Sequence, residues 1–570
     1  MSRVIPTGEQ SFVTLRQKNL FYVDKTRFIQ DWWHSEDRVT LITRPRRFGK
    51  TLMLDTVRAF FSLEYANRQD LFAGLAVWQD ESMRPLQGTL PVISLSFASI
   101  KGENFCQTLK LFNSRLVSIY NDFRPFLDFA SFSDTEQEQF ASVRQSMDEA
   151  TAQDALLYLT KYLARQSGRL PIILLDEYDT PLQEAWMSGY WDELVGLMQG
   201  MLNATFTSNP WLGRGLLTGI TRVGKESLFS DLNNLQVVST TSTLYTDCFG
   251  FTEEEVFAVM DEYGLAARQE VRLWYDGFIF GKTKGIYNPW SIIGYLKNQA
   301  FAPYWAQTSS NALVGQLIAK APKTVKDECS ALICGKSIVT SMDEQVVFSQ
   351  LSGKKSAIWS LLMASGYVKP LSFRSETNEY ELALTNHEVH IILEGLISDW
   401  FNNNYVDSGL FGQALLTDDL ETMNETLREI AENTFSFFDT GGKNTENFYH
   451  AFVLGLIVNL KNVYDIYSNR ESGLGRYDIC MIPKNIHERG IIIEFKTMKP
   501  KKEKDLKETC ANALQQIQDK KYFTILKERG VASHSIYTYG FAFHGKEVLI
   551  CGGLAETIGS LAQDEHVSQM

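Results

Sequence analysis

Residues 38–61 read R-V-T-L-I-T-R-P-R-R-F-G-K-T-L-M-L-D-T-V-R-A-F-F, an apolar strand, an arginine-rich loop and a helical pattern in succession. Gly49, Lys50 and Thr51 match the end of the phosphate-binding pattern G-x-x-x-x-G-K-[ST], whereas Arg44 stands where that pattern has its first glycine. Backbone N–H groups at a helix N-terminus attract phosphate, the lysine neutralises its charge, and the hydroxyl holds Mg²⁺. The stretch therefore predicts a phosphate-binding loop, with a plain arginine-rich connection as the alternative.

A second motif places acidic residues at the end of an apolar strand. L-P-I-I-L-L-D-E (170–177) ends in Asp176 and Glu177. In P-loop enzymes such a strand brings an aspartate beside the metal, and the next glutamate can orient water. Thr218, at the end of a later strand, and Arg222 after it are polar groups in a position to sense a γ-phosphate. Helix capping or a surface role is the alternative for Arg222.

The strand pattern predicts the fold class of the first half. Apolar runs at 39–43, 90–97, 170–179 and 213–220 are separated by helical patterns. Continuous apolar strands that alternate with helices indicate an α/β fold with a parallel sheet covered on both faces. After it, we expect a mainly helical segment (250–330) with a loop at 276–290.

A helix followed by Y-V-K-P-L-S-F (367–373) and Y-E-L-A-L-T-N (380–386) resembles a winged helix. We expect this region to act as a lid on the first domain. Residues 390–437 are helical and acidic and suit a connector, and D-T-G-G-K-N-T-E-N (439–447) carries the turn and cap residues of a domain boundary.

Composition excludes several classes of protein. The 570 residues are 44% hydrophobic and 12% aromatic, which is incompatible with a largely disordered chain. No apolar run is long enough for a membrane span, and the N-terminus has no apolar signal core. Seven scattered cysteines fit reduced thiols and a cytoplasmic location.

The net charge of -13 is unevenly distributed. The acidic excess lies before residue 441, whereas residues 441–570 are slightly basic. A C-terminal part of this kind can approach a phosphate backbone that the remainder would repel. Lysine runs such as 499–507 are more often solvated faces than binding sites.

Two carboxylates and a lysine mark a second candidate site. R-Y-D-I-C-M-I (476–482) and G-I-I-I-E-F-K-T (490–497) read as two strands of a hairpin. Residues i and i+2 of a strand share a face, so Glu494 and Lys496 point the same way and Asp478 can lie across from Glu494. Such acids can hold Mg²⁺, which polarises a phosphodiester, and the lysine can orient water and offset charge. A surface ion pair on an edge strand is the alternative.

Three further side chains are placed to complete this pocket. Gln516 and Tyr522 belong to a predicted long helix at about 505–528, and Glu446, at the start of the preceding helix, can add another metal-facing oxygen. For all three, a plain helix-surface role is an equal alternative.

Taken together, the motifs resemble bacterial proteins that join an AAA-ATPase-like domain to a C-terminal PD-(D/E)XK nuclease-superfamily domain. The N-terminal carriers of the resemblance are Y-V-D-K-T (22–26), R-P-R-R-F-G-K-T (44–51), L-L-D-E-Y-D (174–179), T-G-I-T-R (218–222), L-F-S-D-L-N-N-L (228–235), F-G-F-T-E-E-E-V (249–256) and Y-N-P-W (287–290). The C-terminal carriers are F-Y-H (448–450), N-R-E-S-G-L-G-R-Y-D (469–478), I-E-F-K (493–496) and A-L-Q-Q-I-Q-D-K-K-Y (513–522). The family's loop has the form R-P-R-R-F-G-K-[ST], so a missing first glycine is normal for it.

The resemblance implies a site for ATP and a site for nuclease chemistry. The nucleotide-binding residues expected from it are Arg46, Phe48, Gly49, Lys50, Thr51, Leu52, Asp176, Thr218 and Arg222. The residues expected to act in catalysis are Asp478, Glu494, Lys496, Gln516 and Glu177, and those expected to hold metal are Thr51, Asp176, Asp478 and Glu494. The implied domains are an ATPase-like domain (1–235), a helical lid with a winged-helix-like region (236–390), a helical connector (391–438) and a restriction-endonuclease-like α/β domain (439–570).

We therefore expect an ATP-binding, ATP-hydrolysing protein with a Mg²⁺-dependent nuclease domain, in which Mn²⁺ can replace Mg²⁺. Nucleic acid, DNA in the first place, is the expected substrate, and defence against phage or mobile elements is the expected setting. The alternative is a signal-transduction NTPase whose nuclease-like domain binds a partner without cutting. Homo-oligomer formation, a protein partner, and the action of Arg222 within its own or a neighbouring subunit stay open at this point.

Overall fold

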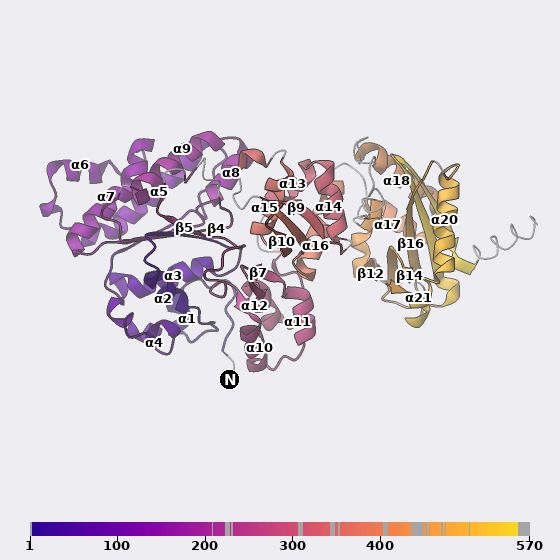
Figure 1. The fold of residues 1–570 in the computed structure, drawn as a ribbon, viewed down its shortest axis with the longest axis horizontal. Coiled ribbons are helices and arrows are strands. Elements are labelled where there is room, and N and C mark those ends of the chain that lie inside the picture. Colours follow the sequence, from indigo (N-terminus) through magenta and orange to yellow (C-terminus); the bar gives the residue numbers. More distant parts are fainter. Residues whose placement is uncertain are drawn as a thin grey trace, which may run out of the picture. The chain divides into compact units, whose positions relative to one another are not determined.

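The computed structural model describes residues 3–207, 209–222, 228–229, 232–305, 312–333, 335–342, 348–351, 354–402, 408–434, 449–450, 453–454, 456–468, 471–472, 475–500 and 502–556. The chain forms two compact units (Figure 1). The first comprises Met1–Leu313, Thr340–Tyr380 and Thr385–Glu388, and the second comprises Val314–Val339, Glu381–Leu384 and Val389–Met570. Glu446 and the predicted boundary at 439–447 lie outside the described residues.

The first unit is built on a parallel sheet with the strand order β2-β3-β4-β1-β5. Its strands are β1 (Val39–Thr43), β2 (Val92–Ser96), β3 (Ile172–Asp176), β4 (Arg214–Gly219) and β5 (Leu235–Val238). All residues of β1, β3 and β4 are buried, as expected for strands with helices on both faces. The predicted α/β class and four predicted strands are confirmed, and β5 adds a fifth strand.

Helices cover both faces of this sheet (Figure 1). One face carries α1 (Phe12–Gln17), α2 (Arg27–His34), α3 (Lys50–Phe61) and α4 (Ala76–Gln79). The other carries α5 (Phe105–Phe123), α6 (Asp134–Ser142), α7 (Glu149–Ser167), α8 (Thr180–Ser188) and α9 (Trp191–Leu202). Phe60, Phe61 and Trp32 are fully buried in the core that α2 and α3 form with the sheet.

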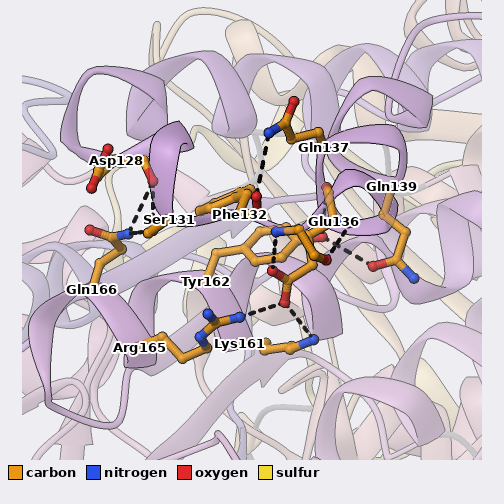
Figure 2. Close-up of polar contacts among 11 residues, drawn as sticks. Asp128, Ser131, Phe132, Glu136, Gln137, Gln139, Lys161, Tyr162, Arg165 and Gln166 are labelled. Atoms are coloured by element: carbon orange, nitrogen blue, oxygen red, sulfur yellow. Dashed lines mark hydrogen bonds and ion pairs between the residues drawn. The ribbon is translucent and has the colours of Figure 1, made fainter.

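An ion cluster joins α6 to α7 within this helical layer (Figure 2). The Glu136 carboxylate lies 2.5 Å from Arg165 Nη1 and 2.9 Å from Lys161 Nζ, and it also caps α6 through a capping box with Ser133. The hydrogen bond and charge of Lys161, with the help of the cap, hold the pKa of Glu136 at about 2. This network ties α6 to α7.

A small antiparallel sheet with the order β6-β8-β7 follows the parallel sheet. The elements are β6 (Phe251–Thr252), α10 (Glu253–Glu262), α11 (Arg268–Tyr275), β7 (Phe278–Phe280), β8 (Thr283–Tyr287) and α12 (Pro289–Asn298). The loop predicted at 276–290 is therefore wrong, because F-I-F and T-K-G-I-Y pair across a turn in which Gly281 adopts a φ of 57°.

The winged-helix-like order is present at the end of this region. A helix, α15 (Lys355–Ala364), is followed by the strands β10 (Val368–Arg374) and β11 (Glu379–Leu384). The remaining elements before the C-terminal sheet are α13 (Ala312–Lys320), α14 (Lys323–Ile333), β9 (Ile338–Ser341), α16 (His387–Asn402), α17 (Ser408–Thr417) and α18 (Leu420–Thr434).

The second unit contains a mixed sheet with the order β12-β15-β16-β17-β18. Its strands are β12 (Tyr464–Ser468), β15 (Ile479–Pro483), β16 (Gly490–Thr497), β17 (Ile536–His544) and β18 (Glu547–Leu554), and the two-residue strands β13 (Glu471–Ser472) and β14 (Gly475–Arg476) pair separately. All pairs in the five-stranded sheet are antiparallel except β16 with β17. The predicted C-terminal α/β fold is confirmed.

Helices also cover the two faces of this second sheet. On one face lies α20 (Leu506–Asp519), and on the other lie α17 and α18, where Phe411 packs against Phe541 and Asp418 accepts a hydrogen bond from Tyr539. The long helix predicted at 505–528 is two helices, because Lys521 adopts a φ of 53° between α20 and α21 (Thr524–Glu528). This break brings Tyr522 back toward α20.

Candidate functional site

The loop after β1 has the backbone that a phosphate requires. Gly49 caps the N-terminus of α3 with a φ of 80°, a conformation that other residues rarely adopt. No heavy atom lies within 4 Å of the position that a Cβ would take at Gly49, so the backbone is open on that side. The N–H groups at the start of α3 are therefore accessible to an anion.

Arg44 explains why this loop needs no first glycine. Its side chain is fully buried, and Nη1 donates to Thr43 O at 2.9 Å and to Ser239 O at 2.7 Å. Longer hydrogen bonds of 3.3–3.4 Å reach Val238 O and the carbonyls of residues 244 and 245, and the guanidinium lies 4.6 Å from the Phe280 ring centroid. Burial lowers the pKa of Arg44 to about 10. Arg44 thus joins the loop to the chain after β5 instead of facing the phosphate position.

Lys50 is buried at the first position of α3. Its Nζ donates to Arg44 O and to Pro45 O, each at 2.8 Å. Burial lowers the pKa of Lys50 to about 8, although the nearby charge of Asp176 favours the protonated form. Two backbone carbonyls therefore hold the ammonium in the loop.

Asp176 lies between two threonine hydroxyls. Thr51 Oγ1 donates to one carboxylate oxygen at 2.7 Å, and Thr218 Oγ1 donates to the other at 2.6 Å. The parallel pairing of β3 with β4 and of β4 with β1 brings these three residues to the same edge of the sheet. Oxygen ligands of this kind suit Mg²⁺, so the donor set fits the metal that accompanies ATP.

The two acids after Asp176 have different surroundings. Glu177 adopts a φ of 53°, which is uncommon for a residue with a side chain, and it accepts a hydrogen bond from Thr180 Oγ1 at 3.1 Å. Asp179 is buried, and its Oδ2 accepts from the backbone N–H groups of Ile220 and Thr221 at 3.0 and 2.9 Å. Asp179 therefore fixes the turn after β4, a role that the sequence analysis missed.

A cavity of about 370 Å³ adjoins the loop. Predicted nucleotide-binding residues at its wall are Arg46, Phe48, Gly49, Lys50, Thr51 and Leu52, together with Glu177. Aromatic and apolar side chains from the N-terminal segment and from α12, such as Tyr22 and Trp290, form another part of the wall. Arg222 is half-buried and is not among the described residues that line this cavity.

Three consecutive residues of the loop contact the small antiparallel sheet and the start of α12. Arg46 O accepts from Asn288 Nδ2 at 3.3 Å, and the Arg47 guanidinium lies 4.4 Å from the Trp290 ring centroid. The Phe48 ring packs on Phe278 at 4.8 Å. The phosphate-binding loop and the region after residue 250 are thus in direct contact.

The C-terminal carboxylates meet at the end of a hairpin. The antiparallel register pairs Ile479 with Ile493, which places Asp478 opposite Glu494 one step further. Asp478 Oδ2 accepts a hydrogen bond from the backbone N–H of Phe495 at 2.8 Å. The predicted hairpin therefore carries Glu494 within β16 and Asp478 one residue before β15.

Glu494, Lys496 and Gln516 form a connected cluster. Lys496 Nζ lies 3.5 Å from Glu494 Oε1, and Gln516 Nε2 donates to the same oxygen. The Glu494 side chain is 3% exposed, whereas that of Lys496 is 27% exposed. Gln516 also donates to the hydroxyl of Tyr522 at 3.2 Å, and burial raises the pKa of that phenol. The structure thus brings four of the predicted residues to one side of the sheet.

Gly540 sets the distance between α20 and this sheet. It pairs with Glu494 in the register of β16 and β17. A Cβ at Gly540 would lie 2.7 Å from Cys510 O in α20, a distance that requires the helix backbone to move. The missing side chain therefore lets α20 approach closely enough for Gln516 to reach Glu494.

The donor set of this cluster fits a hard divalent cation. Two carboxylates within one hairpin are the usual ligands of Mg²⁺, which retains several waters. Within the described ranges, no group of three or more His, Cys, Asp and Glu side chains is arranged to hold a metal ion. Asp478 and Glu494 would therefore share the cation with water or backbone oxygens.

Comparisons with known proteins find one family model over each of the two regions that contain a candidate site. Residues 6–229 match a family model described as predicted AAA-ATPase, and residues 444–552 match a model of the PD-(D/E)XK nuclease superfamily. The chain joins an AAA-ATPase-like domain to a PD-(D/E)XK nuclease-superfamily domain. The predicted resemblance is confirmed, and both domains belong to enzyme superfamilies.

The chain also matches individual proteins. An uncharacterized protein from the vnfD 5′ region of Azotobacter chroococcum mcd 1 is 29% identical over 324 residues, which cover 55% of this chain and 56% of the relative. The match thus spans little more than half of that relative. The Aeropyrum pernix ORC2 protein, solved in ADPNP–ADP complexes, aligns at 10% identity with a TM-score of 0.23, over 66% of this chain and 93% of its own.

Over the ranges that the structure covers, no helix combines the length and the apolar character needed to cross a membrane.

His450, like Arg44 and Asp179, was not predicted as a functional residue. Its imidazole is buried against the backbone of Asp478, and burial lowers the pKa of His450 to about 4, so the ring is neutral at neutral pH.

Proposed function

We propose that the protein binds and hydrolyses ATP and that its C-terminal domain is a Mg²⁺-dependent nuclease regulated by the nucleotide. The main support for a nuclease is the position of Asp478 opposite Glu494. Lys496 and Gln516 both contact the Glu494 carboxylate, so the predicted residues form one cluster. Mg²⁺, or Mn²⁺ in its place, is the expected metal of this site.

In the ATPase-like domain, the open backbone at Gly49 and the ammonium of Lys50 would bind the phosphates. Thr51 and Asp176 would hold the accompanying Mg²⁺. Glu177, at the cavity wall, would orient the attacking water, and Thr218 would keep Asp176 in place. Arg222, which follows β4 and is not among the described residues of the cavity wall, would sense the γ-phosphate within its own subunit or a neighbouring one.

In the nuclease domain, Asp478 and Glu494 would hold the cation, which when bound polarises the scissile phosphate. Lys496 would orient or deprotonate the attacking water and offset the negative charge that develops in the transition state. Gln516 would keep Glu494 in position through their hydrogen bond.

The domain assignment is part of this proposal: ATPase-like domain 1–235, lid 236–390, connector 391–438 and nuclease domain 439–570. The contacts of Arg46, Arg47 and Phe48 with the segment 278–290 support a lid that responds to nucleotide. The slightly basic balance of residues 441–570 supports a nucleic-acid substrate, for which DNA is our first candidate. We also propose a cytoplasmic location and a role in phage or mobile-element defence; the proposal leaves room for a homo-oligomer or a protein partner.

The test is metal-dependent cleavage of plasmid, linear duplex DNA, single-stranded DNA and RNA by the wild-type chain and by Glu494→Gln. Glu488→Gln is the matched control, because Glu488 lies exposed in the turn of the same hairpin. We expect cleavage with Mg²⁺ or Mn²⁺ that Glu494→Gln abolishes and Glu488→Gln retains. ATP hydrolysis without cleavage of any substrate would instead favour an NTPase switch whose nuclease-like domain binds a partner.

A further inference from the structure

His450 contacts Asp478 and the strands β12 and β16. Its side chain is 3% exposed, and Nε2 lies 3.1 Å from Asp478 O and 3.2 Å from Ser468 Oγ. A carbonyl oxygen can only accept, so Nε2 carries the proton and donates it to Asp478 O. The imidazole ring also packs on the ring of Phe495 with the centroids 5.3 Å apart.

These contacts reach Asp478 from the face of the sheet opposite to Gln516. Side chains alternate along β16, so Phe495 points to the face where His450 lies, and Glu494 points to the face covered by α20. His450 therefore contacts Asp478 from the face of the sheet that is opposite to Glu494, Lys496 and Gln516. The imidazole does not occupy the face on which a metal ion would bind.

Asp478 lies one residue before the start of β15. The register of β15 with β16 begins at the pair Ile479 and Ile493, and Asp478 precedes it. Its carboxylate is held by Phe495 N at 2.8 Å, and its carbonyl is held by His450. Asp478 is thus held through both its carboxylate and its carbonyl.

We propose that His450 is a positioning residue that holds Asp478 in the orientation needed for metal binding. The inference rests on the proposed nuclease function, because it assumes that Asp478 is a metal ligand. Groups that orient a metal ligand commonly change metal affinity or activity by about 10- to 100-fold when they are removed. We expect a loss of this size when the Nε2–H donor is removed.

Two variants separate the donor from the bulk of the ring. His450→Phe keeps an aromatic ring on Phe495 but has no N–H, whereas His450→Gln carries a side-chain Nε2–H₂ group that can donate to Asp478 O. Tyr449→Phe is the matched control. It removes a neighbouring hydrogen bond, from the phenol to Gly545 O at 2.7 Å, without a contact to Asp478.

The experiment is calorimetric titration of the full-length, nucleotide-free protein with MnCl₂, with Asp478→Asn defining the heat that belongs to the nuclease site. We expect His450→Phe to weaken that site by about 10- to 100-fold, and His450→Gln and Tyr449→Phe to bind within about threefold of wild type. If His450→Phe does not fold, His450→Leu tests the same loss of the donor. Unfolding temperatures of all variants are recorded in parallel.

The outcomes separate this inference from the proposed function. If Asp478→Asn removes a Mn²⁺ site but His450→Phe binds as wild type, or His450→Gln binds as weakly as His450→Phe, the positioning role is wrong and the nuclease proposal stands. If Asp478→Asn binds Mn²⁺ as wild type, Asp478 is not a metal ligand, and both are wrong.

Discussion

Replacement of Arg44 by glycine would complete the common phosphate-loop pattern. The sequence motif and the contacts of Arg44 predict opposite effects of this variant on ATP binding. A motif-based account expects Arg44→Gly to bind ATP as well as wild type or better. The structure predicts the opposite, because the guanidinium donates to carbonyls at residues 43, 239, 244 and 245 and Lys50 Nζ bonds the carbonyl of Arg44 itself. Loss of the side chain would loosen the loop and the segment after β5 together.

The size of the effect follows from the contacts. A hydrogen bond to a charged group contributes about 1.5–3 kcal/mol, so the two short bonds of Arg44 at 2.9 and 2.7 Å account for about 3–6 kcal/mol. The cation–π contact with Phe280 adds about 1–2 kcal/mol. Burial lowers the pKa of Arg44 from 12.5 to about 10, which corresponds to a cost of about 3 kcal/mol for burying the charged guanidinium. Part of this cost is already included in the net hydrogen-bond energies. We therefore expect Arg44→Met to destabilise the first unit by about 2–4 kcal/mol.

The assay is thermal unfolding with and without Mg²⁺–ATP, followed by titration with a fluorescent ATP analogue. For a unit of about 360 residues, about 3 kcal/mol corresponds to a decrease of about 4 °C in Tm. Arg38→Met is the matched control, because the exposed Arg38 makes a hydrogen bond to Asn209 O at 2.7 Å at the opposite end of β1. A Tm of Arg44→Met within about 2 °C of wild type, or ATP affinity retained in Arg44→Gly, would refute the reasoning.

Glu136 is expected to stabilise the helical layer fully above its ordinary pKa of 4.5, and this contribution decreases as the pH falls toward its folded-state pKa of about 2. The urea midpoints of wild type and Glu136→Gln should therefore differ at pH 6 and converge near pH 2; a constant difference would show that the ion pair with Lys161 contributes no pH dependence. Gly540→Ala should cost about 1–3 kcal/mol, because its Cβ would lie 2.7 Å from Cys510 O, and it should slow cleavage by displacing α20. Gly196→Ala, which meets no atom within 4 Å, is its control, and equal Tm and cleavage rates for both alanine variants would contradict the role of Gly540.

Much of the fold could be predicted because its strands are continuously apolar and separated by helical patterns. The strand β5, Leu235–Val238, was missed because it is short and only Val238 is fully buried. The break between α20 and α21 was missed as well, since Lys521 has no sequence signal for a positive φ. Local sequence patterns therefore predicted the central strands better than the edge strand β5 or the break between two helices.

In the candidate sites, too, some contacts could be predicted from the sequence and others could not. The meeting of Asp176 with Thr51 follows from strand order and helix start, which a sequence pattern indicates. The role of Arg44 could not be predicted, because its partners lie about two hundred residues further along the chain. The support of Asp478 by His450 likewise depends on a tertiary contact that no spacing rule describes.

The most direct test of the central claim is the rate of DNA cleavage with and without ATP, in wild type and in Lys50→Ala. Lys110→Ala, on the exposed face of α5, is the matched control. The account predicts that ATP changes the cleavage rate of wild type and Lys110→Ala but not that of Lys50→Ala, which has lost the ammonium that binds phosphate. An identical response to ATP in Lys50→Ala, with ATP binding abolished, would contradict regulation of the nuclease through this site.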